Sequence, residues 1–225
     1  MKTLLLTGFE PFGGAAANAS AEIVRELSGR IVAGWRIEGA VLPCAFRAAP
    51  RALARLLERH RPGAIVCLGE AAGRGAVTPE LIAVNHDDAR IADNAGHQPV
   101  DTPVVSGGPA AYWSSLPVRA IVAELSARGI PATVSRSAGG FVCNHVFYAL
   151  MHRLARRRSR VLAGFIHVPT AAETSWPVAR STAGIAAALD VTVREAEARA
   201  RTAAAHKRSS PSRRPRGRAN KRSPG

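Results

Sequence analysis

Short apolar runs alternate with amphipathic segments along most of this chain, and no other feature constrains its fold as strongly. The runs at residues 3–7, 64–68 and 161–168 are rich in Leu, Ile, Val and Ala, the pattern of strands that are covered on both faces. Segments with apolar residues at helical spacing lie between these runs. The alternation predicts an α/β domain, in which helices flank both faces of a largely parallel, twisted sheet.

The order of these segments gives a specific set of expected elements. We expect strands at about residues 3–7, 36–42, 64–68, 132–135 and 161–168, and helices at about 20–28, 50–60, 110–127, 143–157 and 176–204. Residues 69–109 are rich in Gly, Asp, Asn and Pro, with one apolar island at 81–84. A loop-rich region of this length is usually functional, and ligands of α/β sheets bind beyond the carboxyl ends of the strands.

The basic residues are distributed unevenly along the chain. The formal net charge is +15 over 225 residues, and residues 206–225 contain eight Lys and Arg and no acidic residue. That segment has no aromatic or aliphatic anchor whose burial could offset the entropy of ordering it, so we expect it to be disordered. The predicted organisation is one domain over residues 1–205 and a basic disordered tail over residues 206–225. The tail can attract RNA or other anionic polymers nonspecifically, although a solvated tail without a dedicated partner is the simpler interpretation.

The cysteines and the N-terminal sequence indicate in which cellular compartment the protein is expected. The chain has three widely spaced cysteines, and none belongs to a Cys-x-x-Cys pair. The apolar run after Met1 is too short for a signal peptide, and no stretch approaches the roughly 20 apolar residues of a membrane span. We therefore expect a cytoplasmic protein without a membrane segment, in which the cysteines are reduced thiols.

Cys143 is the cysteine whose position best suits catalysis. It follows the Gly139-Gly140 pair and stands at the first turn of an expected helix, where free N–H groups and the helix dipole stabilise a thiolate and lower its pKa. The same N–H groups can hold a tetrahedral oxyanion. Cys67, in contrast, lies inside a buried strand, and Cys44 follows Pro43 at a strand end. An inert cysteine at a helix start is the alternative for Cys143.

A thiolate nucleophile needs a base, and the region 85–97 offers further polar groups. His167 closes the apolar strand 161–168, at the rim where ligands bind, although a histidine in this setting is more often a core residue. His145 is two residues from Cys143 and should point to another side of the helix. Five further residues of this region are His86, Asp87, Asp88, Asp93 and His97. They could be interpreted as a metal cluster, but their spacing fits no metal motif. The other interpretation is that these side chains stabilise the loop backbone.

Five motifs in order along the chain resemble the pyroglutamyl peptidase I (pyrrolidone-carboxylate peptidase) family of cysteine peptidases. Each motif alone would be weak evidence, whereas five collinear matches are strong. They are Thr7-Gly8-Phe9-Glu10-Pro11-Phe12-Gly13-Gly14 with Asn18 after it, Leu68-Gly69-Glu70-Ala71-Ala72-Gly73-Arg74, the block from Glu80 to Asn94, Ser137-Ala138-Gly139-Gly140-Phe141-Val142-Cys143-Asn144-His145, and Gly164-Phe165-Ile166-His167-Val168-Pro169.

The resemblance implies a fold, an activity and a set of site residues. The family fold is an α/β/α sandwich, several members are homotetramers, and the reaction removes an N-terminal pyroglutamate from peptides through a thioester, without metal or cofactor. Cys143 would be the nucleophile, His167 the general base and then acid, and Glu80 the carboxylate that orients the imidazole. The resemblance maps the substrate site onto Phe9, Phe12, Asn18, Glu70, Arg90, Ile91, Phe141 and Val142.

Some positions depart from the family pattern. Glu70 stands where Gln is frequent, Leu81 replaces the usual Arg after the catalytic Glu, and Ala92 stands where Pro is usual. None of these departures touches the three catalytic positions. The alternative function is that of a catalytically weak or inactive relative that acts as a binding module, with the basic tail contacting RNA or anionic surfaces.

Overall fold

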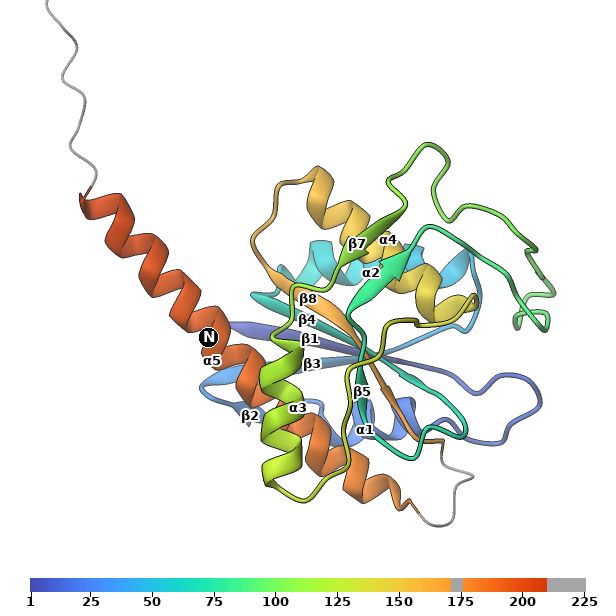
Figure 1. Ribbon diagram of the computed structural model, residues 1–225, viewed down its shortest axis with the longest axis horizontal. Helices are drawn as coiled ribbons and strands as arrows, with labels where there is room; N and C mark the ends of the chain where they lie inside the picture. The colour runs from blue at the N-terminus through green and yellow to red at the C-terminus, as the bar shows by residue number, and fades with distance from the viewer. Residues whose placement is uncertain (171–175, 210–225) are drawn as a thin grey trace, which may run out of the picture.

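The computed structural model describes residues 1–170 and 176–209, and Figure 1 shows a central sheet with helices on both sides. The main sheet has the strand order β2-β3-β1-β4-β8-β5. The four inner strands pair in parallel, whereas β2 and β5 run antiparallel at the two edges. The bounds are Thr3–Phe9 (β1), Ile31–Val32 (β2), Trp35–Leu42 (β3), Ala64–Glu70 (β4), Thr78–Pro79 (β5) and Leu162–Val168 (β8).

Side chains alternate along each strand and divide the core into two layers. Leu4 and Leu6 of β1 pack with one set of helices, and Leu5 packs with the other. The first layer contains α1, α3 and α5, and the second contains α2 and α4. The predicted α/β/α sandwich is confirmed. The helix bounds are Ala19–Leu27 (α1), Ala48–His60 (α2), Val118–Ala127 (α3), Val142–Arg156 (α4) and Val178–Ser209 (α5).

The predicted helix at 110–127 is wrong in its first part. Residues Ala111–Trp113 form strand β7, which pairs antiparallel with β6 (Ile82–Val84) as a separate two-stranded sheet. The aromatic residues at 112 and 113 favour a strand, and Pro117 disfavours a helical conformation at the residue before it. The helix therefore begins only at residue 118.

The predicted strand at 132–135 is reduced to single bridges. Ala132 pairs with Val77, and Ser135 pairs with Glu80, each as an isolated parallel bridge. The segment runs beside the short edge strand β5 and the residues that flank it. It therefore supports the edge of the sheet without extending it as a regular strand.

Helix α5 extends further than expected. Its backbone is helical to Ser209, four residues beyond the predicted domain boundary at 205, and Figure 1 shows its C-terminal part projecting from the rest of the domain. The remainder of the predicted tail, residues 210–225, lies outside the described residues. Among the helices that the structure describes, none has the length and apolar composition needed to cross a membrane.

Candidate active site

The thiol of Cys143 lies over the carboxyl end of the central sheet. Cys143 is the second residue of α4, after Phe141, which is extended and provides no side-chain cap. A Cβ atom built on Gly69 of β4 would lie 2.8 Å from Sγ of Cys143, so the thiol packs directly on the strand backbone. Gly69 is in register with His167 of the neighbouring strand β8. The thiol and the imidazole therefore belong to the same end of the sheet.

His167 also points to the same face of the sheet as Cys143. It follows Phe165 by two residues, and the Phe165 ring approaches Gly69 from the α4 side of the sheet. The ring centroids of Phe165 and His167 are 4.8 Å apart. Nδ1 of His167 lies 2.7 Å from Oε1 of Glu80, and the exposed side-chain fractions of this pair are 3% and 0%. The structure thus pairs His167 with Glu80 and places the Cys143 thiol at the same end and on the same face of the sheet.

The edge strand β5 positions Glu80 against His167. Thr78 of β5 is in antiparallel register with His167, and the backbone N–H of Glu80 donates to the carbonyl of Phe165 at 2.9 Å. Leu81 then continues toward β6, with its N–H donating to the carbonyl of Ser135 at 2.8 Å. The carboxylate is therefore held by backbone pairing on both sides, which fixes its approach to the ring.

Arg74, which belongs to the second of the five motifs, was not predicted to be a site residue, but it contacts Glu80. Its Nη1 donates to Oε1 of Glu80 at 2.7 Å, to Oγ1 of Thr78 at 2.8 Å and to Oγ of Ser135 at 3.2 Å. Its Nη2 donates to the carbonyl of Ser137 at 3.0 Å. The guanidinium therefore ties the carboxylate to the segment that leads into α4. Its place six residues before Glu80, in a Gly-rich loop, was the available sequence signal.

Comparison with known proteins identifies the family that shares this arrangement. A family model described as pyroglutamyl peptidase (Peptidase_C15) matches residues 1–206. The chain belongs to the pyroglutamyl peptidase family. The pyrrolidone-carboxylate peptidase of Gloeobacter violaceus is 56% identical over 166 residues, which cover 74% of this chain and 80% of that protein. The protein of the same name from Chromobacterium violaceum is 55% identical over 169 residues, which cover 75% of this chain and 78% of that protein.

Solved structures of pyroglutamyl peptidases share the fold. The crystal structure of Bacillus amyloliquefaciens pyroglutamyl peptidase I is 41% identical, with a TM-score of 0.81 over 85% of this chain and 97% of that chain. A mutant pyrrolidone carboxyl peptidase from the hyperthermophile Pyrococcus furiosus is 38% identical, with a TM-score of 0.83 over 87% of this chain and 99% of that chain. The resemblance inferred from the five motifs is therefore confirmed at the level of the family.

Burial sets the protonation state of the thiol and the imidazole in this pyroglutamyl peptidase site. Burial, together with Cys44, Glu80 and Glu70, raises the pKa of the Cys143 thiol well above its ordinary value, and Arg74 only partly opposes this. The expectation that the helix start would lower this pKa is therefore wrong, because desolvation outweighs the helix dipole. Burial also lowers the pKa of His167, with Glu80 opposing it. Burial therefore favours the neutral forms of both the thiol and the imidazole.

The carboxylate of Glu80 stays ionised and selects the tautomer of His167. Burial alone would raise the pKa of Glu80, but hydrogen bonds from His167, Ser135 and Arg74 outweigh it and lower the pKa. An ionised carboxylate only accepts hydrogen bonds, so Nδ1 of His167 carries the proton of the 2.7 Å bond. Nε2 is then the unprotonated nitrogen that can receive a proton from the thiol.

Three phenylalanines form an aromatic cluster beside the start of α4. The rings of Phe12 and Phe141 are 5.5 Å apart between centroids, and Phe46 meets Phe141 edge-on at 5.5 Å. Phe12 and Phe141 are partly buried, so part of each ring faces outward. Sequence reasoning assigned Phe12 and Phe141 to the substrate site but missed Phe46, whose place after Pro43-Cys44-Ala45 gave no aromatic motif.

The other predicted substrate-site residues occupy three kinds of position. Phe9 and Val142 are buried in the core, and the Phe9 ring stacks on Phe165 at 6.3 Å. Asn18 caps α1 through Oδ1, which accepts from Ser20 N–H at 3.0 Å, and Oε2 of Glu70 accepts from the Ala19 N–H at 2.9 Å. Two further residues, Arg90 and Ile91, are exposed on the long loop.

The long loop is fixed to α4 next to Cys143. Asn144 accepts from the Val84 N–H at 3.1 Å and donates to the carbonyls of Val84 and His86, both at 2.9 Å. A Cβ atom on Gly140 would lie 2.6 Å from the carbonyl oxygen of Asp88, so only glycine permits the loop to approach this closely. The Gly139-Gly140 pair therefore serves the docking of the loop as well as the entry into α4.

The acidic residues of this loop act on backbone. The Asp93 carboxylate accepts from the N–H groups of Phe46 at 2.7 Å, Ala95 at 2.8 Å and His97 at 2.9 Å. These bonds lower the pKa of Asp93, although burial acts in the opposite direction. Among the side chains described over residues 1–170 and 176–205, no group of three or more His, Cys, Asp and Glu could hold a metal ion. The observed contacts follow the loop interpretation of this region.

A second carboxylate–imidazole pair lies on the other side of α4. Nδ1 of His145 is 2.6 Å from Oδ2 of Asp87, and the His145 ring meets Phe46 edge-on at 5.4 Å. As expected, His145 therefore points away from the thiol that precedes it by two residues. The pair links α4 to the long loop behind the aromatic cluster.

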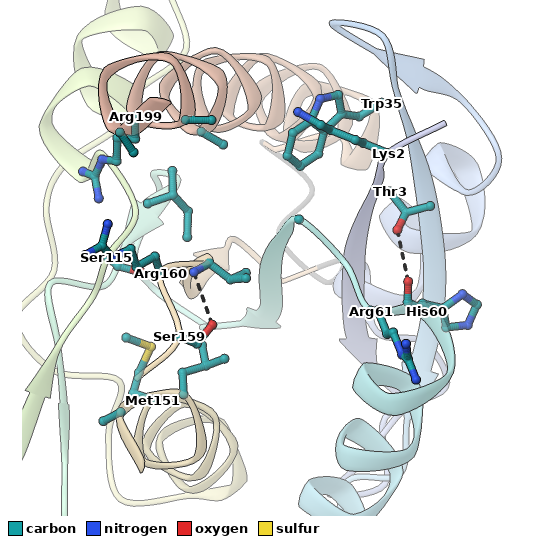
Figure 2. Close-up of a pocket in the computed structure, with 18 of the residues that line it drawn as sticks. Lys2, Thr3, Trp35, His60, Arg61, Ser115, Met151, Ser159, Arg160 and Arg199 are labelled. Carbon is teal, nitrogen blue, oxygen red and sulfur yellow. Dashed lines mark hydrogen bonds between the residues drawn. The ribbon is translucent and has the colours of Figure 1, made fainter. Parts of the chain in front are cut away.

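A large cavity lies at the opposite end of the strands from Cys143. It encloses about 990 Å³ between the amino ends of β1 and β8, the end of α4 and the projecting part of α5. Figure 2 shows Arg61 and His60 on one side of it and Arg160 and Arg199 on the other. Its lining contains Lys2 as a further basic residue and no Asp or Glu. None of the three predicted catalytic residues lines this cavity.

Proposed function

We propose that this protein is a cysteine-type pyroglutamyl peptidase, which hydrolyses the bond between an N-terminal pyroglutamyl residue and the rest of a peptide. Cys143 is the nucleophile, His167 the general base and acid, and Glu80 the carboxylate that orients the ring. The observation that carries the proposal is the packing of the Cys143 thiol on Gly69, whose strand neighbour His167 is bonded to the buried Glu80 at 2.7 Å.

The neutral thiol and imidazole define how the first step proceeds. Since the pKa of Cys143 is raised and that of His167 is lowered, proton transfer accompanies attack instead of preceding it. Sγ adds to the pyroglutamyl carbonyl carbon while Nε2 of His167 takes the thiol proton. The imidazolium that forms is stabilised by the Glu80 carboxylate, whose lowered pKa keeps it ionised.

The start of α4 can stabilise the tetrahedral intermediate. The first N–H groups of a helix have no intrahelical partner, and no side chain caps those of α4. They can donate to the oxyanion that develops on the carbonyl oxygen. His167 then protonates the departing amine, which leaves a thioester on Cys143. Water adds to the thioester with His167 as base, and release of pyroglutamate restores the thiol.

The surroundings suit a small, uncharged ring. The partly buried faces of Phe12 and Phe141 can cover the flat lactam, and its N–H and C=O then require partners within the site. Glu70 is a candidate for this recognition, because its carboxylate already receives the Ala19 N–H at 2.9 Å at the start of α1. A buried lactam partner would reject analogues such as proline more strongly than ring size can.

The decisive experiment compares two fluorogenic substrates and two proteins. We expect release of aminomethylcoumarin from its pyroglutamyl derivative and none from its prolyl derivative. Cys143→Ala should abolish turnover and leave thermal unfolding nearly unchanged, because it removes only the reacting sulfur. Activity of Cys143→Ala at the level of the unsubstituted protein would contradict the mechanism.

Alkylation with iodoacetamide separates the three thiols. Burial raises the pKa of Cys44 and of Cys67 to about 12 each, and neither has a described imidazole partner within the part of the chain that the structure covers. The pKa of Cys143 is raised as well, so only proton transfer to His167 can give this thiol an advantage. On the proposed mechanism Cys143 should react faster than both and should lose this advantage in His167→Ala. All three cysteines are unpaired, which agrees with a proposed location in the reducing cytoplasm. Equal alkylation rates would argue for the alternative of a binding module.

A further inference from the structure

A row of arginines runs along the outer face of α2. Arg47 immediately precedes the helix, and Arg51, Arg55 and Arg59 follow at intervals of four residues. Residues at this spacing lie on one face of a helix, and all four are exposed. At about 1.5 Å of rise per residue the row is about 18 Å long.

These four arginines have no partner among the residues that the structure describes. Neither a hydrogen bond nor a salt bridge of their side chains occurs among the side chains of residues 1–170 and 176–205. Like charges four residues apart weaken a helix, so the row does not serve the stability of α2. Its charge is available to a molecule outside the fold.

The end of α4 extends this basic surface. Glu58 of α2 accepts from Arg153 at 2.6 Å and lies 3.9 Å from Arg157, so the ends of the two helices are side by side. Residues 153–160 add five arginines, and Arg61 and Arg160 lie on opposite sides of the cavity of Figure 2. We call residues 47–61 and 153–160 together the arginine face.

The charge of the folded domain is concentrated on this face. The arginine face has ten arginines and one acidic residue, a net charge of nine, whereas residues 1–205 as a whole have a net charge of seven. All other parts of the domain together are therefore negative by two charges. A general excess of basic residues would not produce this separation.

We propose that the arginine face binds the sugar–phosphate backbone of nucleic acid without reading its sequence. Guanidinium groups match phosphate oxygens in a planar, two-pronged geometry. A row of about 18 Å lies alongside roughly five phosphates of one strand, at about 3.4 Å per nucleotide. This binding is separate from the peptidase site and does not depend on the proposed function.

The side chains around the row argue against base recognition and membrane insertion. The exposed large hydrophobic residues of the described chain all lie outside residues 47–61 and 153–160: Met1, Ile31, Val41, Ile91, Val100 and Trp113. The arginine face therefore offers no exposed Phe, Tyr or Trp ring on which a base could stack and no apolar anchor for a bilayer. Of these modes of binding, only contacts between the arginines and the phosphates of a nucleic-acid backbone fit the side chains of this face.

The test compares two variants of the full chain with equal loss of charge. The first replaces the row by Arg47→Gln, Arg51→Gln, Arg55→Gln and Arg59→Gln. The matched control replaces four exposed arginines of the α1, α3 and α5 layer by Arg25→Gln, Arg119→Gln, Arg128→Gln and Arg194→Gln. Circular dichroism and thermal unfolding check that both variants fold.

Binding is measured by fluorescence anisotropy with a labelled 20-nucleotide RNA over a series of NaCl concentrations. Each lost phosphate contact reduces the slope of log K against log salt by about 0.7, so the first variant should lose about 3 from the slope. Its affinity at low salt should fall about tenfold or more, whereas the control variant should keep the slope of the unsubstituted chain. A second RNA of different sequence should bind with the same affinity.

Three results would overturn the proposal. One is an equal loss of slope in both variants, which would attribute binding to net charge. Another is an unchanged slope in the first variant, which would attribute binding to the tail, since both variants retain it. A third is stronger binding of the unsubstituted chain to phosphatidylserine vesicles than to RNA, lost in the first variant, which would identify a membrane surface instead.

Discussion

Two carboxylate–imidazole pairs flank the start of α4, and their geometry is nearly the same. Glu80 meets Nδ1 of His167 at 2.7 Å, and Asp87 meets Nδ1 of His145 at 2.6 Å. In the first pair the ring shares the face of the sheet on which the Cys143 thiol packs. In the second pair the ring packs on Phe46. The surroundings of a pair, and not its hydrogen bond, therefore decide what it can do.

The two pairs also differ in what holds the acid. Arg74 donates to Glu80 at 2.7 Å and connects it to two hydroxyl groups, whereas Asp87 is held by backbone bonds with Thr102 in both directions. The two acids do share one feature, because Oδ1 of Asp87 and Oε2 of Glu80 are both buried without a hydrogen-bond partner in the described part of the chain. The first acid belongs to a charged network, and the second one fastens a loop.

The largest expected contrast is between the two imidazoles. We expect His167→Asn to lower kcat/KM by about 10²- to 10⁴-fold, because it removes Nε2 while keeping a group that can bond to the carboxylate. His145→Asn should lower kcat/KM by less than about tenfold, because the His145 ring points away from the Cys143 thiol. Steady-state kinetics with the pyroglutamyl coumarin substrate measure both. Comparable losses in the two variants would mean that His145 takes part in the chemistry.

A smaller effect is expected at Arg74, with a characteristic pH dependence. Arg74→Met should lower kcat/KM at pH 7 by roughly 10- to 100-fold, as expected for a group that orients a reactive residue. Since the Arg74 charge helps to lower the pKa of His167, its loss should raise that pKa. Activity requires the neutral ring, so kcat/KM of the unsubstituted protein should fall only as the pH drops below about 6.5. In Arg74→Met this fall should begin at a higher pH.

A matched control for Arg74 lies in the neighbouring loop. Arg136 is exposed and makes no described side-chain bond within the residues that the structure covers, so Arg136→Met removes the same charge without touching Glu80. It should leave the pH profile of kcat/KM in place. If Arg74→Met lowered the rate without moving the acid limb, its role would be limited to the folding of the loop.

The smallest effect on turnover is expected at Asp87. Asp87→Asn should lower the free energy of unfolding by about 1–2 kcal/mol, because a charged hydrogen bond at a buried position is weakened. For a domain of this size that corresponds to a drop in Tm of roughly 2–8 °C, measured by calorimetry. The value of kcat should change by less than about threefold. A large loss of kcat at unchanged Tm would reverse the roles assigned to the two pairs.

Some of these features could be predicted from the sequence because their cause is local. The alternation of apolar runs and amphipathic segments was sufficient to predict the sheet, and the rule that ligands bind beyond strand ends was sufficient to predict the position of His167. The placement of Glu80 came only through the family resemblance, because its backbone pairing with β8 joins residues that are distant in sequence. The pairing of β6 with β7 was missed for the same reason.

Other features depend on burial, which sequence patterns do not report. The helix start at Cys143 was predicted correctly, but its effect on the pKa was not, since the depth of the thiol against Gly69 follows from the packing of α4 on the sheet. Arg74 was missed as a partner of Glu80, because a loop arginine is exposed in most proteins and only the folded loop turns it inward. The arginine row of α2, in contrast, is visible in the sequence once the helix is known.

The two-residue edge strand β5 couples the activity of the protein to its resistance to aggregation. It covers the outer side of β8 and at the same time positions Glu80 against the imidazole. A substitution that detaches β5 would inactivate the protein and also leave unpaired N–H and C=O groups along β8, which can recruit a strand from another molecule. Loss of turnover and a tendency to aggregate should therefore arise together in such variants.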